Sequence, residues 1–196
     1  IWDLVRACKP LDENSMYCNL IQCDHFRDTC VVAELDGEIV GWISGHMIPG
    51  DDAFFVWQVA VGEAARGMGL GKKMLKALIA RDGISDAAVL KTTITKDNAA
   101  SWGLFRSFAR DIGGELSDEP HFEKEAHFDG GLHGQEQSFD RGVVLRAKGG
   151  QHALCQFLLR PGPAKRRFRG GGASARAAEQ EGAGNIRGDK GRVVPH

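Results

Sequence analysis

The stretch "VWQVAVGEAARGMGLGKKML", Val56 to Leu75, decides the fold of this chain. Its first residues are types that favour a β-strand, and its last residues have the apolar spacing of a helix. Between these parts lie Gly67, Gly69 and Gly71, and two lysines follow. A helix N-terminus has unpaired N–H groups and a partial positive charge, and glycine lets the backbone come close to a ligand. The stretch therefore predicts a pyrophosphate-binding loop.

The spacing of these glycines disfavours two common nucleotide sites. A Walker loop needs G-x-x-x-x-G-K-[ST], and a dinucleotide site needs G-x-G-x-x-G; neither fits here. Instead, Arg66-x-x-Gly69-x-Gly71 resembles the coenzyme A signature Q/R-x-x-G-x-G/A of the GNAT superfamily of acetyltransferases. "NAASWGLF", which begins at Asn98, is similar to the helix after that family's fifth strand. The resemblance implies an acetyltransferase.

This resemblance implies acetyl-CoA as the co-substrate and no metal. The strand backbone near Val59 and Val61 would pair with the pantetheine arm, and the loop amides would hold the pyrophosphate. The implied cofactor-binding residues are Val59, Val61, Arg66, Gly67, Met68, Gly69, Leu70, Gly71, Lys72 and Asn98. Asn98 is equally compatible with a helix N-cap.

One position departs from the family's pattern. Many relatives have a tyrosine where this chain has Phe105, as the general acid for the departing thiolate. Phe105 cannot donate a proton, and the only tyrosine of the chain is Tyr17. Protonation of the thiolate must therefore come from another group or from water.

Several further stretches resemble the diaminobutyrate acetyltransferases within this superfamily. They are "CKPLDENSMYCNLIQCDHFRDTCVVAE", "FFVWQVAV", "TITKDNAASWGLFRSFARD" and "HFDGGLHGQE", and the resemblance covers about residues 1 to 137. It implies acetyl transfer from acetyl-CoA to the 4-amino group of L-2,4-diaminobutyrate, by direct attack in a ternary complex. The product, N4-acetyl-L-2,4-diaminobutyrate, belongs to ectoine synthesis. Enzymes of this family are homodimers.

The family's substrate-binding residues match Asp12, Tyr17, Trp57 and Glu136. Two carboxylates suit a substrate with two ammonium groups, and an indole packs well over an ammonium or an alkyl chain. Other interpretations stay open from the residues alone: Asp12 as a helix cap, and Tyr17 and Trp57 as core residues.

The reacting amine must lose a proton, because a free amine has a pKa of about 10. His133 and Glu136 are the candidates for a catalytic base: Glu136 would take the proton directly or through water, and imidazole titrates near neutral pH. A histidine in a glycine-rich loop is also compatible with a plain surface residue. Backbone N–H near Val59 would stabilise the oxyanion.

The rest of the chain predicts an α+β fold, with a GNAT-like mixed, mostly antiparallel sheet flanked by helices. A helix before Pro10 is followed by a second one, capped by Asp12 or Asn14, with Tyr17, Leu20 and Ile21 on its apolar side. The later elements are strands at 29–35, 39–46, 53–61 and 88–94, helices from the glycine loop to 80 and from 96 to 110, and a last strand at 139–145. Residues 115–128 look like a loop with a possible strand.

We expect an acetyltransferase domain at 1–139 and a Gly/Arg/Ala-rich, disordered tail at 140–196, whose first part is compatible with a strand. The tail holds 12 Lys/Arg and 4 Asp/Glu, whereas residues 1–139 hold 13 and 22. A shifted reading frame after about Gln137, or an appended arm, would explain this change in composition and charge. The family's first strand should precede Ile1, which would leave a sheet edge open.

The acidic body suits a small cationic substrate better than nucleic acid, although surplus carboxylates can also serve solubility alone. No apolar run approaches the ~20 residues that cross a bilayer. The five cysteines are odd in number and form no C-x-x-C pair, which favours reduced thiols in a cytoplasmic protein.

Three other functions stay open. The chain would be a GNAT enzyme for another small amine, a CoA-binding module without catalysis, or a nucleic-acid binder through its Arg/Gly tail.

Overall fold

The computed structural model describes residues 1–122, 127, 141–147 and 192–195. The helices are α1 (Trp2–Ala7), α2 (Met16–Asp24), α3 (Leu70–Ile79) and α4 (Ala99–Asp111), with short 3₁₀ turns η1 (Arg27–Thr29) and η2 (Glu63–Ala65). The strands are β1 (Val31–Leu35), β2 (Glu38–Met47), β3 (Ala53–Val61), β4 (Val89–Ile94), β5 (Gly114–Pro120), β6 (Arg141–Ala147) and β7 (Arg192–Pro195).

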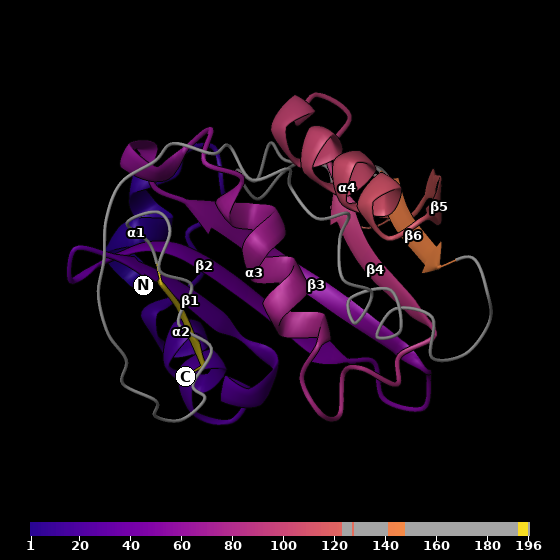
Figure 1. Cartoon of the computed structure of the whole chain (residues 1–196), viewed down its shortest axis with the longest axis horizontal. Helices are drawn as coiled ribbons and strands as arrows, with labels where there is room; N and C mark the ends of the chain where they lie inside the picture. The colour runs from indigo at the N-terminus through magenta and orange to yellow at the C-terminus, as the bar shows by residue number, and fades with distance from the viewer. Residues whose placement is uncertain (123–126, 128–140, 148–191, 196) are drawn as a thin grey trace, which may run out of the picture.

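The strands form one sheet with the order β5-β6-β4-β3-β2-β1-β7 (Figure 1). Only the β3–β4 pair is parallel, and the other neighbours are antiparallel. The predicted mixed, mostly antiparallel sheet is therefore confirmed. Helices cover both faces: α3 and α4 pack on one main core, and α1 packs on a smaller core across the sheet.

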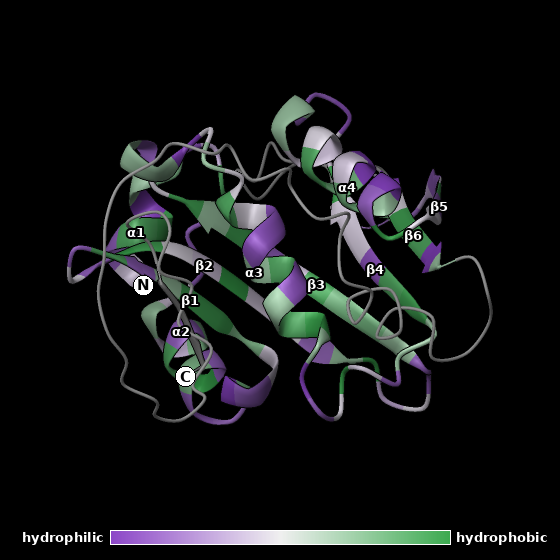
Figure 2. Cartoon of the chain, viewed as in Figure 1, coloured by the Kyte–Doolittle hydropathy of each residue, from purple (hydrophilic) through white to green (hydrophobic). Residues whose placement is uncertain are grey.

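Strand alternation explains how one sheet serves two cores. Along β1 and β2, Ala33 and Ile43 belong to the main core, whereas Val32 and Trp42 belong to the smaller one. Apolar colour accordingly dominates the central strands, while α3 carries both apolar and polar sides (Figure 2). The apolar side predicted for α3 is the one that is buried.

A β-bulge interrupts this alternation next to Trp57. Gln58 pairs with Ser44, but Val56 pairs with Gly45, so Trp57 is the extra residue. Val56 belongs to the main core, and Val59 packs against that same core. In a regular strand, residues three positions apart would lie on opposite faces. The bulge therefore turns the strand, and Gln58 lies on the face of α1 and α2.

Gly45, opposite Val56 and next to this bulge, has no room for a side chain. A Cβ atom at Gly45 would lie 2.5 Å from Cζ of Phe54 and 2.6 Å from the backbone oxygen of Phe55. We expect Gly45→Ala to lower the free energy of unfolding by about 2–3 kcal/mol in urea denaturation. The control is Gly103→Ala in α4, where a Cβ meets nothing within 4 Å; it should be neutral or stabilising by up to ~1 kcal/mol. Equal stability of both variants would contradict this packing argument.

Strands β3 and β4 separate beyond Val56 and Thr92, their last paired residues. β3 continues to Val61, and the two strands diverge toward the N-terminal ends of α3 and α4 (Figure 1). This opening in the middle of the sheet exposes the backbone of β3, and the candidate site lies there.

Helix α2 differs from its prediction in two ways. Its N-cap is Ser15, whose hydroxyl accepts from the N–H of Cys18, so the expected cap at Asp12 or Asn14 is wrong. Its buried residues are polar, Asn19 and Gln22, whereas Tyr17 and Leu20 on the predicted apolar side are 71% and 60% exposed. Periodicity located the helix but not the face that the protein buries.

The chain after α4 also differs in part from expectation. Residues 114–120 form β5, and the expected last strand is β6 at 141–147. Within the predicted tail, the four residues of β7 pair with β1 along the edge that we expected to be open (Figure 1). The other tail residues after 147 lie outside the described part.

Candidate active site

Two adjoining cavities lie along the opening between β3 and β4. The first, of about 900 Å³, is walled by β2, β3, β4, the start of α4 and residues 10–14. The second, of about 660 Å³, is walled by the glycine loop, α3, α4 and the end of β3. Six residues line both cavities: Pro10, Leu11, Val59, Asn98, Ala100 and Ser101. The arrangement suits a long ligand in the second cavity whose end reaches the first.

The glycine loop ends directly at the N-terminus of α3. Gly67 and Gly69 have φ angles of +77° and +68°, which side chains other than glycine rarely adopt. The first backbone hydrogen bond of the helix runs from the N–H of Lys73 to the carbonyl oxygen of Gly69. Gly69 is the N-cap residue, and no described side chain makes a capping hydrogen bond at this helix end. The N–H groups of Leu70 to Lys72 therefore have no carbonyl one turn earlier, and these residues line the second cavity.

Basic side chains accompany this helix end. Lys72 and Lys76 both contact Oδ2 of Asp111, at 3.1 and 2.9 Å. The hydrogen bond from Lys76, followed by that from Lys72, holds the pKa of Asp111 below its usual range. One carboxylate thus faces two ammonium groups, which leaves an excess of positive charge beside the loop.

The structure brings together nine of the ten predicted cofactor residues, because all except Met68 line the second cavity. Asn98 does so while its side chain accepts from the N–H of Ser101 at 3.0 Å, so Asn98 is also the N-cap of α4. Phe105 is buried and lines the first cavity. It presents no hydroxyl there.

The predicted substrate-binding and catalytic residues fall into three groups according to where the structure places them. Asp12 and Trp57 line the first cavity, and Trp57 is 46% exposed, so its interpretation as a core residue is wrong. Tyr17 is neither in the core nor among the residues that line either cavity. His133 and Glu136 lie outside the described residues.

His46 is a cavity residue that the sequence did not reveal. Its ring centroid lies 5.4 Å from that of Phe55 and 6.1 Å from that of Trp57, and the ring is edge-on to the indole. Burial lowers the pKa of His46 below its ordinary value, which favours the neutral imidazole. A neutral imidazole adds no positive charge that would repel an ammonium group on this side of the cavity.

No helix among the described residues is both long and apolar enough to cross a membrane. No group of three His, Cys, Asp or Glu side chains there could hold a metal ion.

The model of the acetyltransferase (GNAT) family matches residues 1–109. The chain is 49% identical over 126 residues to the L-2,4-diaminobutyric acid acetyltransferase of Methylotuvimicrobium alcaliphilum, covering 64% of this chain and 73% of that protein. The corresponding protein of Vibrio cholerae is 44% identical over 131 residues, or 66% and 76% of the two chains.

Among solved structures, diaminobutyrate acetyltransferase from Paenibacillus lautus, in complex with L-2,4-diaminobutyric acid and coenzyme A, matches with a TM-score of 0.68. It is 32% identical, and the match covers 77% of this chain and 87% of that one. The fold, the glycine loop and these matches define an acetyltransferase of the GNAT family. Within that family, the chain belongs to the L-2,4-diaminobutyric acid acetyltransferases.

Proposed function

We propose that this chain transfers the acetyl group of acetyl-CoA to the 4-amino group of L-2,4-diaminobutyrate. The observation that carries the proposal is the pair of adjoining cavities: one has a helix N-terminus for a diphosphate, and the other has a carboxylate and an indole for an amine. The relative from Paenibacillus lautus forms a complex with L-2,4-diaminobutyric acid and coenzyme A. The product is a precursor in ectoine synthesis, and we infer that the active form is a homodimer.

Coenzyme A would lie with its diphosphate on the amides of Gly69 to Lys72 and its pantetheine arm along Val59 and Val61. Beyond Val56, β3 is no longer paired with β4, so its backbone groups on that side are available to the arm's amides. The thioester would then reach Val59, which lines both cavities.

The amine would bind in the first cavity, with one ammonium group at Asp12 and the alkyl chain on Trp57. A base removes a proton from the 4-ammonium group; Glu136 or His133 has that role in our proposal. The neutral nitrogen attacks the thioester carbonyl and a C–N bond forms. The nitrogen then loses a second proton to solvent, and the C–S bond breaks to leave the amide. The thiolate takes its proton from water or a group other than Phe105, which has none to give.

The arrangement of the cavities supports direct transfer with both substrates bound. The residues shared by the two cavities would bring the ends of the two ligands together, and proximity would then supply a large part of the rate. No covalent acetyl-enzyme is required. The N–H groups near Val59 would stabilise the oxyanion.

Mass spectrometry of the product tests this function. The protein is incubated with acetyl-CoA and L-2,4-diaminobutyrate, and the acetylated nitrogen is located by fragmentation. We expect a single acetyl group on the 4-nitrogen. Turnover of other amines but not of this one would indicate a different GNAT substrate, and acetyl-CoA binding without turnover of any amine would indicate a non-catalytic module.

A further inference from the structure

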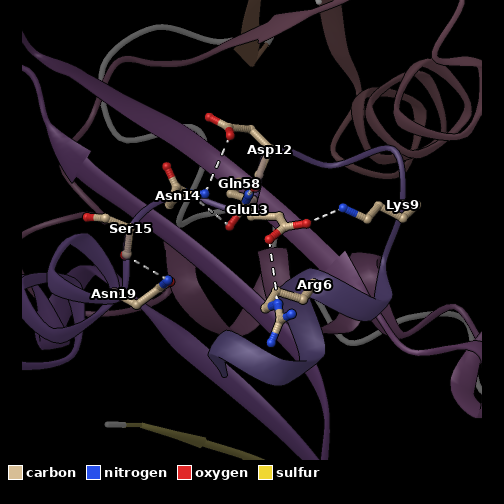
Figure 3. A network of polar contacts seen from close by, with 8 residues as sticks. All are labelled: Arg6, Lys9, Asp12, Glu13, Asn14, Ser15, Asn19 and Gln58. Atoms are coloured by element: carbon tan, nitrogen blue, oxygen red, sulfur yellow. Dashed lines mark hydrogen bonds and ion pairs between the residues drawn. The ribbon is translucent and has the colours of Figure 1, made fainter. Parts of the chain in front are cut away.

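Gln58 joins the strand of the active site to the loop that carries Asp12. Its Nε2 donates to the backbone oxygen of Asp12 at 2.6 Å, and its Oε1 accepts from Nδ2 of Asn14 at 3.3 Å (Figure 3). Gln58 is only 7% exposed, and it lines the first cavity. A buried amide whose two polar atoms are both used on one loop fixes that loop closely.

The loop itself has a conformation that needs such support. Asn14 has a φ angle of +54°, and its N–H donates to Oδ1 of Asp12 at 3.4 Å. On the outer side, Glu13 contacts Lys9 and lies 3.5 Å from Arg6, in exposed ion pairs that contribute little stability (Figure 3). The partly buried hydrogen bonds of Gln58 therefore hold this loop more firmly than these exposed ion pairs do.

The β-bulge puts the side chain of Gln58 on the face of the sheet where the Asp12 loop lies. If residues 56–58 formed a regular strand without a bulge, the side chain at 58 would lie on the same face as Val56, toward the main core. With it, Gln58 lies beneath the Asp12 loop, and Trp57 lines the cavity beside it. One irregularity of β3 thus sets the positions of both an aromatic wall and a carboxylate.

We propose that Gln58 is a positioning residue for the amine substrate, which holds the Asp12 carboxylate at the mouth of the first cavity through hydrogen bonds to Asp12 and Asn14. This inference rests on the proposed function, in which Asp12 binds an ammonium group. Gln58 lies behind the loop and does not itself bind the ammonium group.

The test is Gln58→Met, which keeps the volume of the side chain but removes its hydrogen bonds. We expect the KM for diaminobutyrate to rise about fivefold, with kcat and the Kd for acetyl-CoA changed by less than about twofold. Backbone hydrogen exchange at residues 11–14 should become faster. Asn14→Gly keeps the positive φ angle and removes one of the two bonds, so a rise in KM of about twofold to threefold is expected.

Gln22→Met is the matched control. It makes the same substitution at an equally buried position of α2, where the amide has no hydrogen-bond partner among the described residues. It should change neither the KM nor the exchange at 11–14. An unchanged KM in folded Gln58→Met, or an equal rise in Gln22→Met, would overturn the inference while wild-type turnover still supports the proposed function. A wild-type protein that does not acetylate diaminobutyrate would overturn the proposed function itself.

Discussion

Gly69→Asp is expected to weaken acetyl-CoA binding about 100-fold while leaving the protein folded. The substitution places a carboxylate at the N-terminal end of α3, where we propose that the diphosphate binds. Two like charges ~4 Å apart repel by a few kcal/mol near a protein surface, and a 100-fold loss corresponds to ~2.7 kcal/mol. A Cβ at Gly69 meets nothing within 4 Å, and Asp tolerates a positive φ angle better than most residues.

Gly69→Asn is the control, because it has nearly the same shape and tolerance for positive φ but carries no charge. We expect it to weaken binding by less than about tenfold. Isothermal titration calorimetry with acetyl-CoA measures both variants, and thermal melting shows that both are folded. Equal affinities of the Asp and Asn variants would mean that no anionic group binds at this helix end.

Asp12→Asn should raise the KM for diaminobutyrate or lower kcat at least about tenfold. The change keeps the size of the side chain and removes the charge that would face an ammonium group. Asp12 lines the first cavity only, so the Kd for acetyl-CoA should stay nearly constant. Steady-state kinetics and calorimetry together separate the two effects.

Glu136→Gln is expected to have an effect of the same size, through loss of a base or of a second ammonium contact. A pH–rate profile distinguishes these roles, because only loss of a base changes the dependence of kcat on pH. Wild-type kinetics in both the Asp12 and Glu136 variants would refute their assignment to the amine site.

The elements with strong local signals were predictable. β3 was predicted at its observed bounds, and the turn at Asp36-Gly37 has the positive φ angles of the hairpin that these residues favour. The helix after the glycine loop also has its predicted buried side. In each case the residues that define the element are neighbours in sequence, so local physics suffices.

What escaped prediction depends on contacts between distant segments. The bulge at Trp57 lies where Gly45 of β2 packs closely against Phe54, and no pattern within β3 alone predicts it. His46 and Gln58 join the site only because of that pairing and the β3–β4 opening. Helix α2 likewise buries the polar residues Asn19 and Gln22, which the apolar periodicity of its own sequence does not predict.

The most direct test of the central claim is an NMR titration of the ¹⁵N-labelled protein with acetyl-CoA. If the backbone amides at the start of α3 bind the diphosphate, the signals of Gly69, Leu70, Gly71 and Lys72 should shift to lower field with one common saturation curve. Binding of acetyl-CoA that leaves these four amide signals in place, or no binding by the folded protein, would contradict the account.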